Sequence, residues 1–151
     1  MATAIKTLLL NALKADVTAI TAYKSVSLNP MTLPKGDDTT KTRPFACIID
    51  MPEDEIVEDN RYRQASFDLT VISYLHVDLY ESLSTDLTEA GALLYQTLVS
   101  PNATHRGYSV RIKEKADEKM FFSEYEGCMI NTFRITYKHA RGNPYIINPL
   151  P

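Results

Sequence analysis

The sequence predicts an α+β domain with a mostly antiparallel β-sheet, two principal helices packed on one face, long loops and an extended C-terminal tail. The chain has 151 residues, the usual size of one domain. Two segments repeat apolar residues every three or four positions, as amphipathic helices do, whereas the other apolar segments are short or alternate, as strands do. Strands also follow one another around a single middle helix, and this order favours antiparallel pairing.

The first expected element is an amphipathic helix that begins near residue 5, with Thr3 as a candidate N-cap. Residues 24–43 are rich in Pro, Gly and short polar side chains, so we expect a long connection there rather than a packed element. The apolar stripe of the helix consists of Ile5, Leu8, Leu9, Ala12, Leu13 and Ile20.

Two strands are expected next. Residues 45–51 form a short apolar run between Pro44 and Pro52, which is typical of a buried strand. Residues 64–75 alternate apolar and polar side chains and give the strongest strand signal in the chain. The acidic segment 52–60 between them is expected to be an exposed loop.

The second helix is expected to start at a cap on Ser82 or Ser84 and to stop at 100–102, Ser-Pro-Asn. Its apolar stripe is Leu83, Leu87, Ala90, Leu94 and Leu98.

Three further strand candidates follow the second helix, at 108–113, 120–122 and 127–137. Residues 123–127 have the length of a hairpin loop between the last two. The charged run 113–119 is expected to be a solvated turn between two strands.

The last segment, 139–151, shows neither the helix nor the strand period. It still carries four apolar side chains, those of Tyr145, Ile146, Ile147 and Leu150. We therefore divide the chain into a single domain at 1–138 and an extended tail at 139–151.

Composition and motifs exclude several functions. A net charge of −3 and a pI near 5.6 disfavour a protein that grips nucleic acid with its whole surface. Cys47 and Cys128 lie in apolar runs, where reduced cysteines behave as small hydrophobes, although one disulfide or a reactive thiol is the alternative. The first six residues lack the basic region, apolar stretch and cleavage site of a signal sequence, so we expect none, and no apolar run is long enough to span a membrane.

The three histidines, His76, His105 and His139, are not at metal-ligand spacing, and the five glycines are isolated from one another. We therefore expect no metal, no cofactor and no enzymatic activity. The one enzymatic alternative is a metal-dependent nuclease built from three consecutive residues, 117–119, with Asp50 or Asp68. Those three residues, Asp117, Glu118 and Lys119, belong to the charged run, for which a solvated turn is the simpler interpretation.

Charge is unevenly distributed along the chain. Six carboxylates lie between Asp50 and Asp59, while Arg61 and Arg63 follow directly and other basic residues gather near the C-terminus. A solvated loop is the simple interpretation of the acidic segment, and contact with a basic surface of another subunit or partner is the alternative. Separate acidic and basic edges would suit repeated head-to-tail contacts between identical copies.

The order of elements resembles the tail terminator family of tailed bacteriophages, also described as tail completion or minor tail protein U-like proteins. The likeness is carried by the helix at 5–13, the run Pro-Phe-Ala-Cys-Ile-Ile-Asp at 44–50, and the acidic loop leading into the strand at 63–74. The second helix and the closing strand Thr-Phe-Arg-Ile-Thr-Tyr at 132–137 complete it.

The resemblance implies a structural virion protein that forms a homohexameric ring at the head-proximal end of the tail tube. Such a ring stops tube polymerisation, joins the tail to the head connector or stopper, and lets DNA pass without sequence-specific binding. The protein would be found in the virion tail or neck, and in the host cytoplasm during assembly. Another neck or minor tail protein of similar fold is the nearest alternative, and a small-ligand-binding α+β domain is a third.

Subunit or tube contacts are expected on loops and strand edges and on the apolar tail. The candidate interface residues are Lys35, Lys41, Arg43, Glu53, Asp54, Glu55, Glu58, Asp59, Arg61, Arg63, Tyr145, Ile146 and Ile147.

Overall fold

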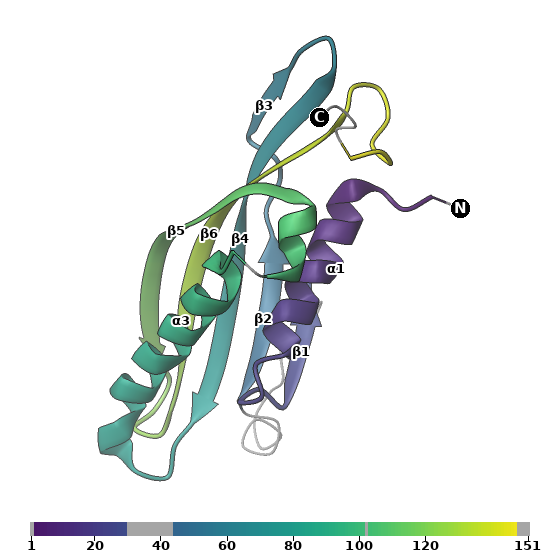
Figure 1. Cartoon of the computed structure of the whole chain (residues 1–151). Coiled ribbons are helices and arrows are strands. Elements are labelled where there is room, and N and C mark those ends of the chain that lie inside the picture. Colours follow the sequence, from purple (N-terminus) through teal and green to yellow (C-terminus); the bar gives the residue numbers. More distant parts are fainter. Residues whose placement is uncertain (1, 30–43, 102, 148–151) are drawn as a thin grey trace.

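The computed structural model describes residues 2–29, 44–101 and 103–147. Over these residues the chain forms a six-stranded sheet in the order β1-β2-β4-β6-β5, with β3 paired to one end of β4 (Figure 1). Two helices, α1 and α3, cover one face of this sheet (Figure 1). The described strands are β1 Ser25–Leu28, β2 Phe45–Asp50, β3 Glu55–Glu58, β4 Tyr62–His76, β5 Ser109–Phe121 and β6 Glu126–Ala140. The helices are α1 Ile5–Thr18 and α3 Leu83–Val99, with short 3₁₀ turns η1 Tyr80–Ser82 and η2 Thr104–Gly107.

The predicted α+β class is confirmed. Among the described strands only the pairing of β1 with β2 is parallel, and every other pairing is antiparallel. β4 and β6 form the central pair and remain in register over their whole length, from Tyr62 opposite Ala140 to His76 opposite Glu126.

Helix α1 begins at Ile5, as predicted, and buries Ile5, Leu9 and Leu13 of the predicted stripe. Leu8 and Ala12 are half-buried, and Ile20 is buried just after the helix ends. Only the cap differs from the prediction. Ala4 occupies the N-cap position without a side-chain hydrogen bond, so Thr3 is not the cap. The Ile5 amide instead donates to the carbonyl of Pro144, at 2.8 Å. The C-terminal segment thus satisfies an amide that a capping side chain would otherwise serve.

Helix α3 lies where the second apolar stripe predicts it. Ser82 takes the N-cap position, but its hydroxyl donates to the Leu79 carbonyl at 2.9 Å and caps no helix amide. In the middle turn the buried residue is Gly91 rather than the predicted Ala90. A Cβ at position 91 would lie only 2.9 Å from Cε of Met129, so the close approach of helix and sheet favours glycine at this position.

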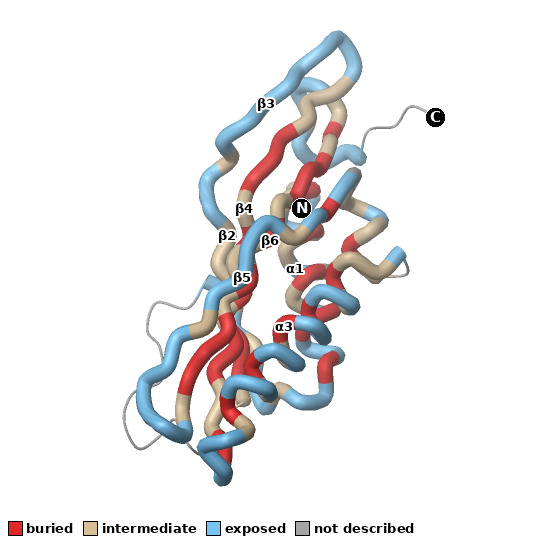
Figure 2. Tube along the Cα trace, turned by 90° about the vertical axis from the view of Figure 1, so that its left-hand side faces the viewer, coloured by how far each residue is buried: buried red, intermediate tan, exposed pale blue. Residues whose placement is uncertain are grey.

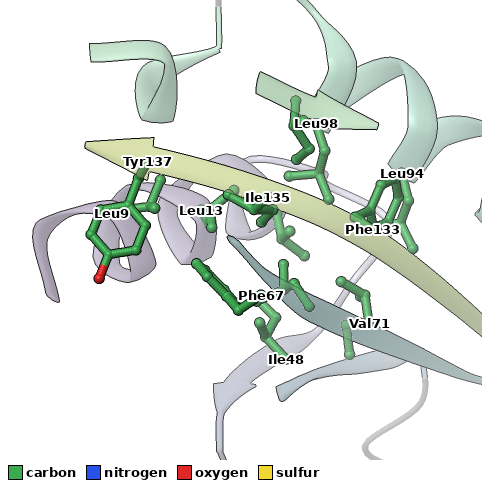
Figure 3. Packing of buried hydrophobic residues seen from close by; sticks show 14 of the residues in the cluster. Leu9, Leu13, Ile48, Phe67, Val71, Leu94, Leu98, Phe133, Ile135 and Tyr137 are labelled. Atoms are coloured by element: carbon green, nitrogen blue, oxygen red, sulfur yellow. The ribbon is translucent and has the colours of Figure 1, made fainter. Parts of the chain in front are cut away.

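The core lies between the two helices and the sheet (Figure 3). Leu9 and Leu13 of α1, and Leu94 and Leu98 of α3, pack against a layer of strand residues. That layer includes Ile48, Phe67, Leu69, Val71, Phe133 and Ile135, all fully buried. The strand alternation predicted for 64–75 and 127–137 is therefore confirmed.

Three segments expected to be irregular form strands instead. Ser25–Leu28, within the predicted 24–43 connection, is β1 and pairs with β2. Glu55–Glu58, within the predicted acidic loop, is β3, although all four residues are exposed as expected. The charged run 113–119 is no turn, because β5 continues through it as an edge strand. An edge strand exposes one side to solvent, and charged side chains there protect it against pairing with other chains.

The C-terminal segment continues the fold beyond the last predicted strand. β6 runs to Ala140, so its final two residues fall within the segment predicted as an irregular tail. The chain then turns at Gly142, whose φ of +73° suits glycine, and the Ala140 amide donates to the Ile146 carbonyl at 2.8 Å.

The sheet face opposite the helices has a small apolar cluster of its own, built on Phe45, Cys47, Tyr74 and Cys128. The rings of Phe45 and Tyr74 stack with centroids 4.6 Å apart. Both cysteines are buried and outside any disulfide, as predicted, and burial raises the pKa of the Cys47 thiol to about 11. β4 lies between their strands, which keeps the two thiols too far apart for a disulfide.

Candidate assembly surfaces

Residues 52–64, which we call the arm, form a β-hairpin that projects beyond the helix-covered part of the sheet (Figures 1 and 2). Its turn is shaped by Asp59, whose Oδ1 accepts the amides of Arg61 and Tyr62 at 2.7 and 3.0 Å. These two backbone hydrogen bonds lower the pKa of the Asp59 carboxyl. The acidic segment is therefore a formed hairpin and not an irregular loop.

Glu53 joins the base of the arm to the sheet and to α1. Its Oε2 accepts a hydrogen bond from Arg63 at 2.7 Å, and Lys6 of α1 lies 3.7 Å from Oε1. The hydroxyl of Tyr137, on β6, also donates to this carboxylate. Partial burial raises the pKa of Glu53, but hydrogen bonds from Tyr137 and Arg63 outweigh burial, so the net pKa is lowered.

A second ion-pair cluster surrounds Arg134 on β6. Its guanidinium lies 2.6 Å from Asp54 and 3.2 Å from each of Glu55 and Asp68. Lys115 of β5 also reaches Asp68, at 2.8 Å. Hydrogen bonds from Lys115 and Arg134 lower the pKa of Asp68 against the opposing effect of burial.

Three of the predicted acidic interface residues, Glu53, Asp54 and Glu55, are thus neutralised by basic groups of the same chain. Over the described part of the chain, by contrast, Glu58 and Arg61 take part in no ion pair, and both are exposed. The charges left to meet a partner therefore lie toward the arm tip rather than at its base.

Sequence reasoning missed the apolar residues of the arm. Ile56 and Val57 on β3 are 53% and 49% exposed, and Met51 just before the arm is 47% exposed. The available signal was a β-branched pair inside an acidic segment, which is unusual for a solvated loop.

The apolar residues predicted in the tail are also exposed. Tyr145, Ile146 and Ile147 keep between 45% and 51% of their surface accessible. The Arg141 amide donates to the Arg61 carbonyl at 3.0 Å, so the tail lies against the turn of the arm. The structure thereby brings together two of the three predicted interface segments. The third contains Lys35, Lys41 and Arg43, which lie outside the described residues.

The residues proposed for a nuclease are not brought together. Asp117 pairs with Asn131 and lies on the helix-covered face, whereas Asp68 pairs with Arg134 and lies on the opposite face. Asp50 is on β2, three strands from β5, at a separation of about 14 Å. Among the described residues, no three His, Cys, Asp or Glu side chains are grouped to hold a metal ion.

One buried ionisable pair joins α1 to η2. Nδ1 of His105 lies 2.9 Å from Oδ2 of Asp16, and the His105 amide donates to the same oxygen at 3.2 Å. Burial lowers the pKa of His105 against the opposing effect of Asp16. The pair holds the segment after α3 against the first helix.

The fold and surfaces define an α+β domain with a projecting arm and an apolar tail, and other exposed apolar side chains include Leu79, Tyr80 and Phe121. No described helix is long and apolar enough to cross a membrane. Neither a protein-family model nor a curated protein sequence matches the chain. Among solved structures, a chain from the virion of a native gene transfer agent particle is similar, with a TM-score of 0.50 and 18% sequence identity. The match covers 89% of this chain and 92% of that chain, so the two share a fold over nearly their whole length.

Proposed function

We propose that this chain is a structural protein of a phage-like virion and acts as its tail terminator. The observation that carries the proposal is the exposed apolar surface of the arm and tail. Large exposed apolar groups beside polar rims mark protein–protein contacts. The fold shared with a chain of a gene transfer agent virion supports a virion context for these contacts.

In this role, six copies would form a ring at the head-proximal end of the tail tube. One face of the ring would reproduce the contacts that a tube ring offers to the next, and the other face would lack them, so growth would end there. The second face would bind the head connector or stopper. The chain would carry out no reaction, and it would need neither a metal nor a cofactor.

The ring would also let DNA pass through its centre. A net charge of −3 per copy is compatible with passage, because a strongly basic lumen would hold the phosphate backbone. The ion pairs of Arg134 and Lys115 with carboxylates support this, since they leave less free positive charge on the helix-free face.

The test uses the tail tube protein of the same virion. Tubes polymerised with this chain should be shorter than tubes grown alone, and electron microscopy should find a cap at one end only. Unchanged tube length with no cap would refute the terminator role. Binding to the head connector without any effect on tube length would instead favour another neck protein of the same fold.

A further inference from the structure

A groove of about 490 Å³, which we call the α1–α3 groove, lies between the segment that follows the C-terminal end of α1 and the middle of α3. Its walls are mainly apolar, and they come from Ile20, Tyr23, Leu75, Val77, Ala90 and Leu93. Leu93 lies on α3 outside the buried stripe of that helix, and its side chain is 39% exposed. The groove is therefore an apolar, concave surface without a described covering segment.

The exposed side chains of Tyr145, Ile146 and Ile147 have the complementary property, because they form an apolar projection. They are held at the opposite end of α1, where the Pro144 carbonyl accepts the Ile5 amide (Figure 1). Helix α1 has 14 residues, which separates its two ends by about 21 Å. The tail of one molecule therefore cannot fill the groove of the same molecule.

Charge also matches between the two surfaces. The groove is lined on its α3 side by Asp86 and Glu89, and neither has an ion pair within the part of the chain that the structure describes. Beside the tail lie Arg141 and Arg61, whose backbones are hydrogen-bonded to each other. Neither arginine takes part in an ion pair over the same described ranges, although the charge of Arg61 also helps to lower the pKa of Asp59 in the turn of the arm. Two carboxylates thus line the concave surface, and two arginine residues neighbour the projecting one in the fold.

We infer that the tail of one copy, through Tyr145, Ile146 and Ile147, docks into the α1–α3 groove of a second copy. Arg61 and Arg141 of the first copy then meet Asp86 and Glu89 of the second. The contact joins different surfaces of the two molecules, so it is head-to-tail and can be repeated around a closed ring. It rests on the proposed function in that it names a contact through which the ring closes.

Disulfide trapping tests the contact directly. The native thiols of Cys47 and Cys128 are 1% and 2% exposed and do not compete. Ile146→Cys and Leu93→Cys are made in separate chains, mixed, and oxidised under conditions in which light scattering detects assembly of the mixture. A covalent dimer of about 34 kDa, twice the 17.0 kDa of one chain, is expected from the mixture. The matched control is Tyr95→Cys, on the same helix and more exposed than Leu93 but lining a different groove, and it should give no covalent dimer with Ile146→Cys.

Charge reversal provides a second measurement. Glu89→Arg alone and Arg141→Glu alone should each weaken association by about three- to tenfold, and the chain that carries both should recover most of the loss. Assembled rings without the Ile146–Leu93 cross-link, or cross-linking equal to that of the Tyr95→Cys control, would overturn the inference and leave the proposed function standing. A cross-linked oligomer that does not affect tube growth would instead overturn the proposed function and leave the contact standing. A chain that stays monomeric with the tube protein at high concentration would refute both.

Discussion

The carboxylate of Glu53 is expected to stabilise the fold by fixing the base of the arm. The variant Glu53→Gln keeps the shape of the side chain and removes its charge. It weakens the hydrogen bonds from Arg63 and Tyr137 and the pairing with Lys6. Hydrogen bonds to charged groups contribute about 1.5–3 kcal/mol each, but the side chain is 17% exposed and water replaces part of the loss. We therefore expect the free energy of unfolding to fall by about 1–2 kcal/mol at pH 7.

Urea denaturation at several pH values measures this contribution. The pKa of Glu53 is lower in the folded protein than its ordinary value of 4.5, so ionised Glu53 favours the folded state. The contribution is complete above the unfolded pKa and is lost as the pH falls through the folded pKa. The difference between wild type and Glu53→Gln should therefore shrink below about pH 4.

The matched control for this prediction is Glu58→Gln, an exposed carboxyl on β3 without an ion pair among the described residues. Its free energy of unfolding should stay within about 0.5 kcal/mol of wild type at every pH. Equal stability of the two variants at pH 7, or a difference that persists undiminished in acid, would refute the role assigned to Glu53.

Three other predictions concern the core, the tail and the arm. Phe133→Ala should lower the free energy of unfolding by about 3–5 kcal/mol in urea, because its ring is fully buried beneath the helices, and a loss below about 1 kcal/mol would contradict this core. Truncation after Ala140 removes the acceptor of the Ile5 amide, so the free energy of unfolding should fall by about 1 kcal/mol. Thermal unfolding should remain cooperative, whereas assembly measured by light scattering should be abolished. Loss of the cooperative transition would instead make the tail part of the core. Ile56→Ser with Val57→Ser should leave stability within about 0.5 kcal/mol and reduce capping of tubes, and unchanged capping would remove these residues from the interface.

The sequence predicts those elements whose pattern is local and strong. Leu83, Leu87, Leu94 and Leu98 repeat at helical spacing, and the structure buries all four. The alternation along β4 and β6 likewise identifies the residues that face the helices, because the period of a strand places every second side chain on the same face.

The elements missed by the sequence analysis depend on distant partners. β1 has only four residues, and it is a strand because β2 pairs with it in parallel. β5 carries charges through its middle, which a local pattern assigns to a turn, yet an edge strand tolerates them. Short or charged strands are set by tertiary pairing and not by their own composition.

The candidate interface was predicted only in part for the same reason. The tail residues were found because their apolar character is evident without a partner. The neutralisation of Asp54 by Arg134 joins residues 80 positions apart, so the sequence alone did not show that Arg134 pairs with the acidic segment. The groove on α3 was not predicted either, because the segment that follows α1, the end of β4 and α3 all contribute to it.

The most direct test of the account is the mass of the protein in solution, measured by light scattering over a range of concentrations with and without its tail tube protein. The account predicts a species of about 102 kDa, six times the 17.0 kDa of one chain, and its loss in a chain truncated after Ala140. A mass of one chain at every concentration, with no association with the tube protein, would contradict it.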